Sequence, residues 1–570
     1  MRNRIAPSLL MTLLMALAWP TLASADPQRP PAAAIASAHP AATQAGLTVL
    51  EAGGNAFDAA IAVAAALAVV EPAGSGMGGG GFWLLHRQHD GHQTMLDARE
   101  TAPGRARHDM YLDEHGEVVR DRAINGPLSA GIPGQAAAFV HLAEHYGEVP
   151  LSVSLAPAIA LAEEGFPVSP RYRLLAGFRE RAMQRYPDTA RIFLHEGQIP
   201  PEGHVIRQPE LAKVLRALAE KGFAGFYEGE IARRMVEAVQ QEGGIWSLAD
   251  LRDYRVVERE PIITEFRGAR IVSAPPPSSG GVVLAQVFNM LSRFNDGDID
   301  PALLPHLNVE AMRRAYHDRA VYLGDPDHVE MPLDTLLDPA YARARAASIR
   351  LDRPTPSSDL GPPMAQPEGT HTTHFSVLDQ DGNRVAATLS INLPFGSGFT
   401  VPDTGILLNN EMDDFSAKPG APNAYGLVGS EANAIAPGKR PLSSMTPTFV
   451  EWDDQVAILG TPGGSRIITM VLLGIQQALA GEPVDAWVSA PRYHHQYLPD
   501  VIQVEPEVLG STLAKTLEVR GHTLESVGRV YGDMHAVHWD RGSDSVSAAS
   551  DPRGEGSFTV IPRRDRPPEH

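Results

Sequence analysis

Cysteine is absent from the 570-residue chain. Its absence excludes a thiol nucleophile, a disulfide and a lipid-modified cysteine. A hydroxyl group can replace a thiol as nucleophile, but only if a base lies beside it. Threonine and serine are therefore the side chains to examine first for covalent chemistry.

Long apolar runs are also scarce, and the one that stands out lies near the N-terminus. Arg2 and Arg4 precede an apolar stretch from Leu9 to Leu22, and Ala23-Ser24-Ala25 follows it. This order is typical of a secretory signal peptide, with cleavage after Ala25. The alternative is a membrane anchor, but the run is short for a span and Pro20 interrupts it. We expect an exported protein, periplasmic or secreted, with no membrane span.

Basic residues are outnumbered. The chain has 48 Lys and Arg against 68 Asp and Glu, a net charge of −20, which becomes −22 without the two arginines of the signal peptide. Such a surface disfavours nucleic acid as a partner and favours a small-molecule substrate. The sequence has neither a long Gly/Ser linker nor a repeat. Only the Pro-rich stretch PTPSSDLGPPMAQPEG, residues 354–369, looks flexible enough to be threaded or cut.

Hydrophobic periodicity predicts an α+β protein. Helices and strands interleave without the regular βαβ rhythm of a parallel sheet. The predicted helices cover 40–70 with a break at Gly53-Gly54, 150–165, 209–220, 228–242, 309–322 and 467–479. The predicted strands cover 82–86, 94–99, 270–274, 374–379, 384–391, 447–451, 456–460 and 557–561.

The segment GTHTTHFSVLDQDGNRVAATLSIN, residues 369–392, directly follows the Pro-rich stretch and contains Thr372-Thr373. A threonine that becomes an N-terminus can use its own α-amine as base. That amine titrates near ~8, closer to working pH than the ~10.4 of lysine. An internal threonine reaches this state only if the chain is cut before it. The alternative is that Thr372 merely starts a β-strand.

The same segment predicts a β-hairpin with a defined register. Asp379-Gln380-Asp381-Gly382 fits a three-residue loop with a glycine bulge. If Asp379 and Asn383 close the loop, Thr372 lies opposite Ser390, and Asn392 falls on the same face. A two-residue loop would shift the register by one residue and separate the two hydroxyls.

Four further polar clusters have both a functional and a structural interpretation. Arg99 in LDARETAP could hold a carboxylate, or could form a surface ion pair. Glu411 and Asp414 in NNEMDDF could hold an ammonium group, or could belong to a solvated turn. Ser443-Ser444 could be a turn only, and Gly463-Gly464, before the helix at 467, could be an oxyanion site or a tight turn.

Two common cofactor sites are disfavoured. GSGMGGGGF, residues 74–82, has GxGxxG spacing, but a helix precedes it and a strand follows, the reverse of a dinucleotide site. Close backbone packing explains these glycines better. The NNEMDDF spacing does not match a calcium loop, and His494-His495 lacks a third ligand at a metal-binding spacing. We therefore expect no metal and no organic cofactor.

Taken together, the motifs resemble those of the γ-glutamyltranspeptidases, also called glutathione hydrolases, over essentially the whole mature chain. The matching blocks are AGGNAFDAAIAVA, GSGMGGGGF, LDARETAP, PPPSSGG, TTHFSVLDQDGN, SINLPFGSG, GILLNNEMDDFSAKPG, KRPLSSMTPT, TPGGSR and PRYHHQ. The resemblance implies an N-terminal-nucleophile hydrolase with an αββα sandwich. It also implies a proenzyme that cuts itself into two subunits, which stay together.

Residue roles follow from the resemblance, motif by motif. Cleavage falls between His371 and Thr372, giving a large subunit 26–371 and a small subunit 372–570, with Thr372 as the nucleophile. Ser390 stands where the family has a hydroxyl, commonly threonine, that hydrogen-bonds the nucleophile. The remaining roles are an α-carboxylate clamp of Arg99, Ser443 and Ser444; an α-ammonium site of Asn392, Glu411 and Asp414; oxyanion N–H groups of Gly463 and Gly464; and a lid loop, 421–440, that places Tyr425 over the substrate.

The activity implied is cleavage of the γ-glutamyl amide of glutathione and related compounds through a Thr-linked ester. The acyl group then passes to water or to an amino acid or dipeptide. Relatives of this architecture suggest alternatives: a glutaryl-β-lactam acylase or a poly-γ-glutamate depolymerase. An unprocessed glutathione-binding protein is a further alternative.

Overall fold

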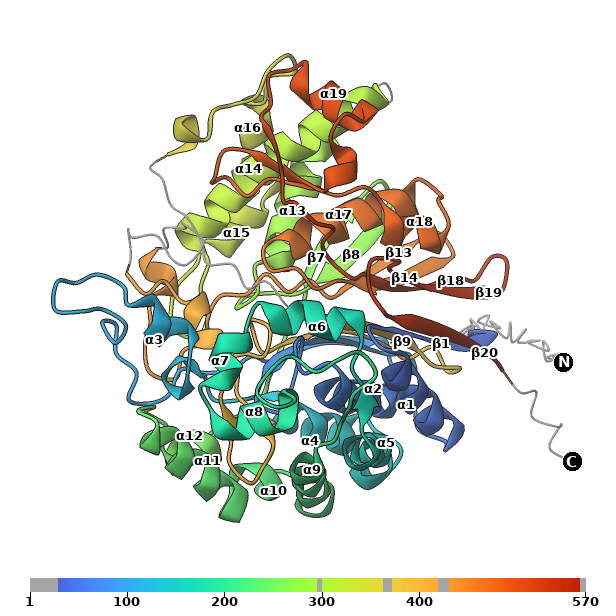
Figure 1. Ribbon diagram of the computed structural model, residues 1–570. Coiled ribbons are helices and arrows are strands. Elements are labelled where there is room, and N and C mark those ends of the chain that lie inside the picture. Colours follow the sequence, from blue (N-terminus) through green and yellow to red (C-terminus); the bar gives the residue numbers. More distant parts are fainter. Residues whose placement is uncertain (1–28, 295–299, 362–371, 419–429, 564–570) are drawn as a thin grey trace, which may run out of the picture.

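Two β-sheets packed face to face form the centre of the molecule (Figure 1). The computed structural model describes residues 29–294, 300–361, 372–418 and 430–563. The first sheet has the strand order β20-β1-β9-β10-β2-β3-β6 and the second β19-β18-β14-β13-β8-β7. The strands of the first sheet are β20 (Ser557–Pro562), β1 (Ala32–Ser37), β9 (Thr373–Leu378), β10 (Arg384–Ser390), β2 (Gly80–Arg87), β3 (His92–Ala98) and β6 (Val257–Arg259). Those of the second are β19 (Ser545–Ser550), β18 (His535–Asp540), β14 (Gln455–Gly460), β13 (Thr448–Trp452), β8 (Ala269–Ser273) and β7 (Ile262–Phe266).

Helices cover the outer face of each sheet, which gives the four layers of an αββα sandwich. The first sheet is covered by α1 (Pro40–Glu51), α2 (Ala56–Val70), α4 (Gln135–His145), α5 (Leu151–Glu164) and α9 (Pro209–Lys221). The second is covered by α13 (Gly280–Leu291), α14 (Leu304–Tyr322), α17 (Arg466–Leu479) and α18 (Val484–Ser489). A third apolar cluster, which includes Phe82, Phe449 and Trp539, fills the space between the sheets. The predicted α+β class and αββα architecture are confirmed.

The central strands β9 and β10 are buried on both faces. Phe375, Val377 and Leu389 belong to the cluster under the helices, whereas Leu378 and Ala386 belong to the cluster between the sheets. Because alternate side chains face different clusters, a slip by one residue would exchange the two sets of side chains, which fixes the register.

The predicted hairpin register is confirmed. Thr373 lies opposite Leu389 and Leu378 opposite Arg384, so Thr372, one residue before β9, is in register with Ser390. The loop closes as predicted, because Asp379 N–H donates to Asn383 O at 3.0 Å and Gly382 has φ +95°. Asp379 also accepts the N–H of Ala56 at 2.9 Å, which ties the loop to the start of α2.

Most predicted elements are present within a few residues of their expected ends, with two corrections. The helix expected at 309–322 begins earlier, at Leu304. The strand expected to reach 391 ends at Ser390, and Asn392 adopts φ +72°, so the chain turns there and does not continue along the strand face. Among the elements of the four layers, helices α4, α13 and α18 and strands β1, β6, β7, β18 and β19 were not predicted from the sequence.

The glycine-rich segment 74–82 lets backbone segments approach each other closely. A Cβ on Gly79 would lie 2.2 Å from the Ser390 carbonyl oxygen, and one on Gly78 would lie 2.2 Å from that of Leu407. The predicted role in close packing is therefore confirmed, and the segment holds the end of β10 in place.

Both sheets combine strands from before and after residue 371. In the first sheet, β1 lies between β20 and β9, and β10 pairs with β2. In the second, β13 pairs with β8. Neither part of the chain can complete a sheet or cover its apolar faces alone, because the hydrogen-bonding partners of its strands lie in the other part.

We therefore predict that residues 26–371 and 372–570, produced as two separate chains, fold only when they are expressed together. Co-expression should give one complex on size exclusion with a single cooperative unfolding transition in urea. Each chain alone should be insoluble or should lack a cooperative transition. If residues 372–570 folded cooperatively by themselves, this account of the sheets would be contradicted.

Candidate active site

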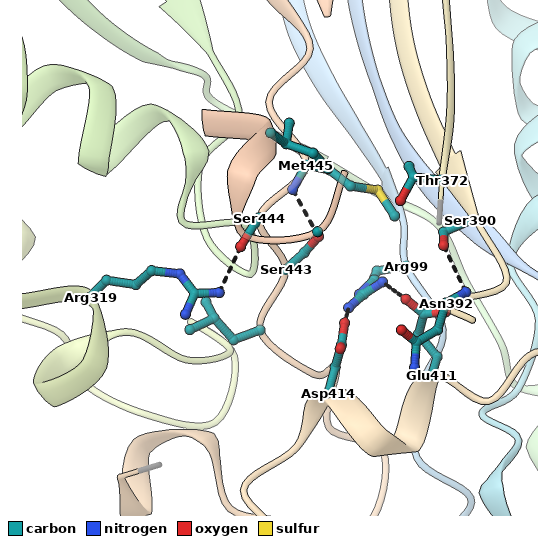
Figure 2. A pocket seen from close by; sticks show the side chains of 13 residues that line it. Arg99, Arg319, Thr372, Ser390, Asn392, Glu411, Asp414, Ser443, Ser444 and Met445 are labelled. Atoms are coloured by element: carbon teal, nitrogen blue, oxygen red, sulfur yellow. Dashed lines mark hydrogen bonds and ion pairs between the residues drawn. The ribbon is translucent and has the colours of Figure 1, made fainter. Parts of the chain in front are cut away.

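Most of the predicted site residues line one cavity. Thr372, Ser390 and Asn392 come from the end of the central hairpin, and a short 3₁₀ turn, Glu411–Asp414, supplies the two acids. Arg99 follows directly after β3. Ser443, Ser444 and Gly464 complete the predicted members of the lining, which also contains Arg319, Leu442, Met445 and Ile467. Figure 2 shows Thr372 and Ser390 at one end and Arg99, with its acidic partners, below them.

Thr372 and Ser390 are both buried, with 6% and 2% of their surface exposed, respectively. Ser390 Oγ accepts the N–H of Asn392 at 2.7 Å, which explains how the turn at Asn392 is held. Asn392 in turn donates from Nδ2 to Asn410 O at 2.9 Å, whereas its Oδ1 is buried without a hydrogen-bond partner among the described residues. An unpaired buried carbonyl oxygen at a cavity wall can accept a donor from a ligand.

The centre of the cavity is a buried cluster of charges. Arg99 has no exposed surface and pairs with Glu411 through Nη1 and with Asp414 through Nη2. Its Nε donates to Pro441 O at 3.2 Å. The cluster leaves a free volume of about 20 Å³, close to the space of a single water molecule. A larger guest needs side chains of the lining to move.

Burial governs the protonation of these acids. It raises the pKa of Glu411 and of Asp414 above the ordinary range, although Arg99 opposes the increase in both. For Arg99 itself, burial is more than offset by the two carboxylates, which raise its pKa. Burial also raises the pKa of Glu100 far above its usual value, and the negative charge of Glu411 adds to the effect. Both effects favour the neutral form of Glu100, although its carboxyl lies 3.9 Å from Arg99 Nη1.

Arg319, on α14, was not singled out in the sequence. Its Nη2 donates to Ser444 Oγ at 2.9 Å and its Nε donates to Ser279 Oγ at 2.6 Å. Because the Ser444 oxygen already accepts this bond, its own hydrogen can point to another acceptor. No periodic signal marks Arg319, since α14 also buries other charged residues, such as Glu310 and Arg314.

Backbone hydrogen bonds fix the serine loop. Ser443 N–H donates to Pro277 O at 2.7 Å, and Ser279 N–H donates to Ser443 O at 2.9 Å. The PPPSSGG segment therefore acts as the support of Ser443-Ser444. The turn expected as the structural alternative is not found: Ser443 forms a parallel β-bridge with Ser278, and the two serines line the cavity.

The two glycines before α17 lie on different cavities. Gly464, with φ +62°, lines the cavity of Arg99, whereas Gly463, with φ +141°, lines a second cavity, and Thr372 lines both. His371 and Tyr425 lie outside the described residues, as does the predicted cleavage site of the signal peptide. The described end of the expected lid loop is attached to the acidic turn, because Asn433 Nδ2 donates to Asp414 O at 2.7 Å.

Metal-binding and membrane-spanning features were sought in the same parts of the chain. Within residues 29–294, 300–361, 372–418 and 430–563, no group of three or more His, Asp or Glu side chains is placed to hold a metal ion. No helix in these ranges combines the length and the apolarity needed to cross a membrane.

The chain is similar to known proteins along nearly its whole length. The family model for gamma-glutamyltranspeptidase matches residues 42–561. The glutathione hydrolase proenzyme of Escherichia coli (strain K12) is 41% identical over 535 residues, which cover 92% of this chain and 91% of that protein. The structure of cephalosporin acylase from Bacillus halodurans superposes with a TM-score of 0.80 at 29% identity, covering 96% of this chain and 99% of that one. A chain of Helicobacter pylori gamma-glutamyltranspeptidase gives a TM-score of 0.54 at 39% identity, covering 57% of this chain and 94% of that one. The chain therefore belongs to the γ-glutamyltranspeptidase family, a family of N-terminal-nucleophile hydrolases.

Proposed function

We propose that this protein cleaves the γ-glutamyl amide of glutathione and related γ-glutamyl compounds, with Thr372 as nucleophile. The observation that carries the proposal is the arrangement of opposite charges in one buried cavity beside a threonine hydroxyl. Arg99, Ser443 and Ser444 provide donors for a carboxylate, while Glu411 and Asp414 provide acceptors for an ammonium group. A γ-glutamyl group ends in an amino-acid head with both charges, on a carbon chain that leads to the reacting carbonyl.

Binding would proceed by exchange of ion pairs. In the empty cavity Arg99 neutralises Glu411 and Asp414 internally. An incoming α-carboxylate takes over Arg99, together with the free hydrogen of Ser444, and the α-ammonium takes over the two acids. Every buried charge then keeps a partner, which avoids the cost of several kcal/mol for an unpaired buried ion. The recognition also positions the γ-carbonyl at Thr372.

The catalytic steps follow from a free N-terminus at Thr372. In the uncut chain its nitrogen belongs to the peptide bond with His371, and its hydroxyl attacks that carbonyl in an N→O acyl shift. Hydrolysis of the ester releases residues 26–371 and the α-amine. In turnover the α-amine accepts the hydroxyl proton while the oxygen attacks the γ-carbonyl, and the N–H groups of Gly463 and Gly464 stabilise the oxyanion. The amine half leaves with a proton, and water or another amine then resolves the γ-glutamyl ester.

Two features support a subunit pair and export. In both sheets strands of the two parts pair with each other, which would keep the parts together after a cut. The match to the Helicobacter pylori chain covers 57% of this chain. This fraction is close to the part that the expected large subunit, residues 26–371, would form. The signal-peptide pattern up to Ala25 places the mature protein in the periplasm or outside the cell.

A glutaryl acylase is the second candidate, because cephalosporin acylase from Bacillus halodurans has a similar fold. A glutaryl group has a carboxylate but no ammonium. The buried pair Glu411 and Asp414 would then have no cationic partner once Arg99 turned to the substrate, which favours the γ-glutamyl head.

We predict that Thr372→Ala remains a single chain and has no activity, because the variant lacks the hydroxyl needed for both reactions. Denaturing gels and N-terminal sequencing measure the cut. Thr373→Ser is the matched control, since it keeps a hydroxyl at the neighbouring position and should be cut before residue 372. A Thr372→Ala chain that is still cut there would overturn the self-processing mechanism.

We predict that Asp414→Asn lowers kcat/KM for a γ-glutamyl anilide about 30- to 100-fold, as expected for the loss of one buried charged partner. For a glutaryl anilide, which lacks the ammonium, the value should not fall. Asp413→Asn is the matched control, because Asp413 lies in the same turn but does not line the cavity. If kcat/KM fell equally for both anilides, Asp414 would maintain the structure of the site and would not bind the ammonium. If the wild-type protein preferred the glutaryl anilide, the acylase function would be favoured.

We predict that KM for a γ-glutamyl donor rises as pH falls from 8.5 to 6. The ammonium is bound by ionised carboxylates. Burial raises the pKa of Glu411 to about 7 and also raises that of Asp414, so Glu411 takes up a proton within this range, where free acids stay ionised. KM measured against pH tests this, and KM for the glutaryl anilide serves as the reference. A flat profile for the γ-glutamyl donor would show that the acids stay ionised throughout.

A further inference from the structure

A second cavity adjoins the nucleophile. Among the residues that line the two cavities, Thr372 is common to both. Four arginines line the second one, Arg171, Arg466, Arg529 and Arg553, together with Phe178 and Tyr531, and its lining contains no carboxylate. An amide that is attacked at Thr372 has two halves, so two cavities that meet there suit the two halves of one substrate.

The four guanidinium groups differ in how well they are neutralised. Arg553 is bound by both oxygens of Glu505, at 2.7 and 2.8 Å. Arg171 pairs with Asp533 at 3.1 Å, but burial raises the pKa of that acid to about 7, so the pair keeps part of its positive charge at neutral pH. Arg529 is exposed and stacks on Phe178, with its guanidinium carbon 5.2 Å from the ring centroid. Within the described residues Arg529 makes no ion pair.

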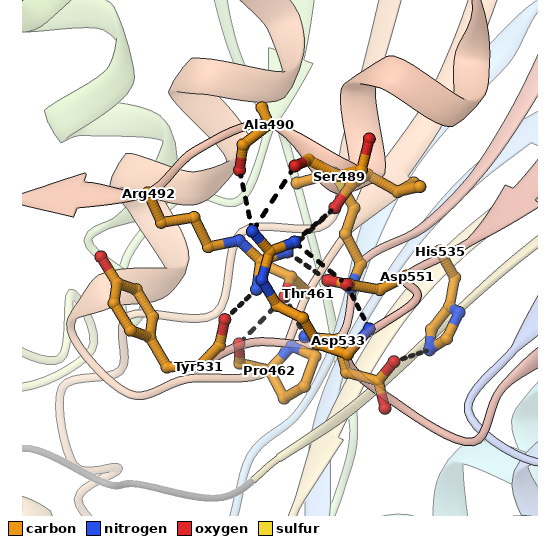
Figure 3. Close-up of polar contacts among 12 residues, drawn as sticks. Thr461, Pro462, Ser489, Ala490, Arg492, Tyr531, Asp533, His535 and Asp551 are labelled. Carbon is orange, nitrogen blue, oxygen red and sulfur yellow. Dashed lines mark hydrogen bonds and ion pairs between the residues drawn. The ribbon is translucent and has the colours of Figure 1, made fainter. Parts of the chain in front are cut away.

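Two buried donors in the same lining lack partners. Arg171 Nε and the Tyr531 hydroxyl are buried and have no hydrogen-bond partner among the described residues. Such groups cost free energy unless an acceptor reaches them. Figure 3 shows Tyr531 beside Arg492, which donates to the Tyr531 carbonyl and to Asp551. These contacts hold the Tyr531 backbone, and the ion pair with Asp533 holds the guanidinium of Arg171.

We propose that this cavity binds the amine half of the reaction and selects amines that carry a carboxylate, with Arg529 as the specificity-determining residue. The inference rests on the proposed function, since the first cavity must hold the acyl half. In the forward step the carbon–nitrogen bond breaks, and the leaving amine takes the proton that the α-amine of Thr372 received from its hydroxyl. In transfer, the acceptor amine enters the same cavity, attacks the ester carbonyl and returns a proton to the Thr372 oxygen. Phe178 and the neighbouring apolar side chains Leu174 and Val530, which are largely exposed, suit the carbon parts of amino acids and dipeptides.

The test compares donors and acceptors that differ in one charge. Arg529→Gln should lower the ratio of kcat/KM for glutathione to that for a γ-glutamyl anilide without a carboxylate about tenfold, the loss expected for one charge-assisted contact. Arg529→Lys, which keeps the charge, should restore most of the ratio. In transfer from the anilide, Arg529→Gln should raise KM for a dipeptide acceptor but not for the same dipeptide with an amidated C-terminus.

Arg267→Gln is the matched control, because Arg267 is also exposed and stacks on an aromatic ring, Phe266, at 5.2 Å, on the turn between β7 and β8. Arg267→Gln should leave unchanged both the ratio of kcat/KM for glutathione to that for the anilide and the KM for the dipeptide acceptor. Equal losses on glutathione and the anilide, or no loss on either, would overturn the assignment of Arg529. A wild-type protein that cleaves neither donor would instead overturn the proposed function, so the two failures are distinguishable.

Discussion

The register of the β9–β10 hairpin is the constraint on which the site depends. Both strands are buried between two apolar clusters, so a shift by one residue would turn each apolar side chain to the wrong layer. That register places Thr372 opposite Ser390 at the end of the central strands. The close approach of Gly79 to the Ser390 carbonyl then holds this end of the hairpin against β2. Thr372, the proposed nucleophile, is thus positioned by the core of the protein, and a cut before it would leave the position intact.

Electrostatic compensation is the second organising feature. A buried arginine with two buried carboxylates is costly to assemble, and such a cluster persists only if every charge is paired. Arg99, Glu411 and Asp414 meet this condition without a ligand by pairing with each other. A zwitterionic head can replace these ion pairs one for one. A ligand with a single charge leaves either Arg99 or the two carboxylates without a partner of opposite charge. This difference is the basis of the proposed preference for an amino-acid head.

Much of the fold could be predicted from the sequence because its signals are local. The hairpin loop followed from Asp379 and Gly382, and the break between α1 and α2 from Gly53-Gly54. The turn at Asn392 could not be predicted, because its positive φ depends on contacts with Ser390 and Asn410, which come from different parts of the fold. The cavity members Arg99, Asp414 and Ser443 were found by motif, since no local pattern brings them together. Arg319 was missed because it lies in a helix whose polar residues are mostly buried, and only the tertiary structure shows which of them reaches Ser444.

Trapping of the covalent intermediate tests the central claim most directly. Wild-type protein would be mixed with a γ-glutamyl donor, quenched in acid, digested and analysed by tandem mass spectrometry. The account predicts one γ-glutamyl group in ester linkage on the hydroxyl of Thr372, in a peptide whose N-terminus is Thr372 itself. A γ-glutamyl group on Thr373 or Ser390, or on Thr372 still joined to His371, would contradict it.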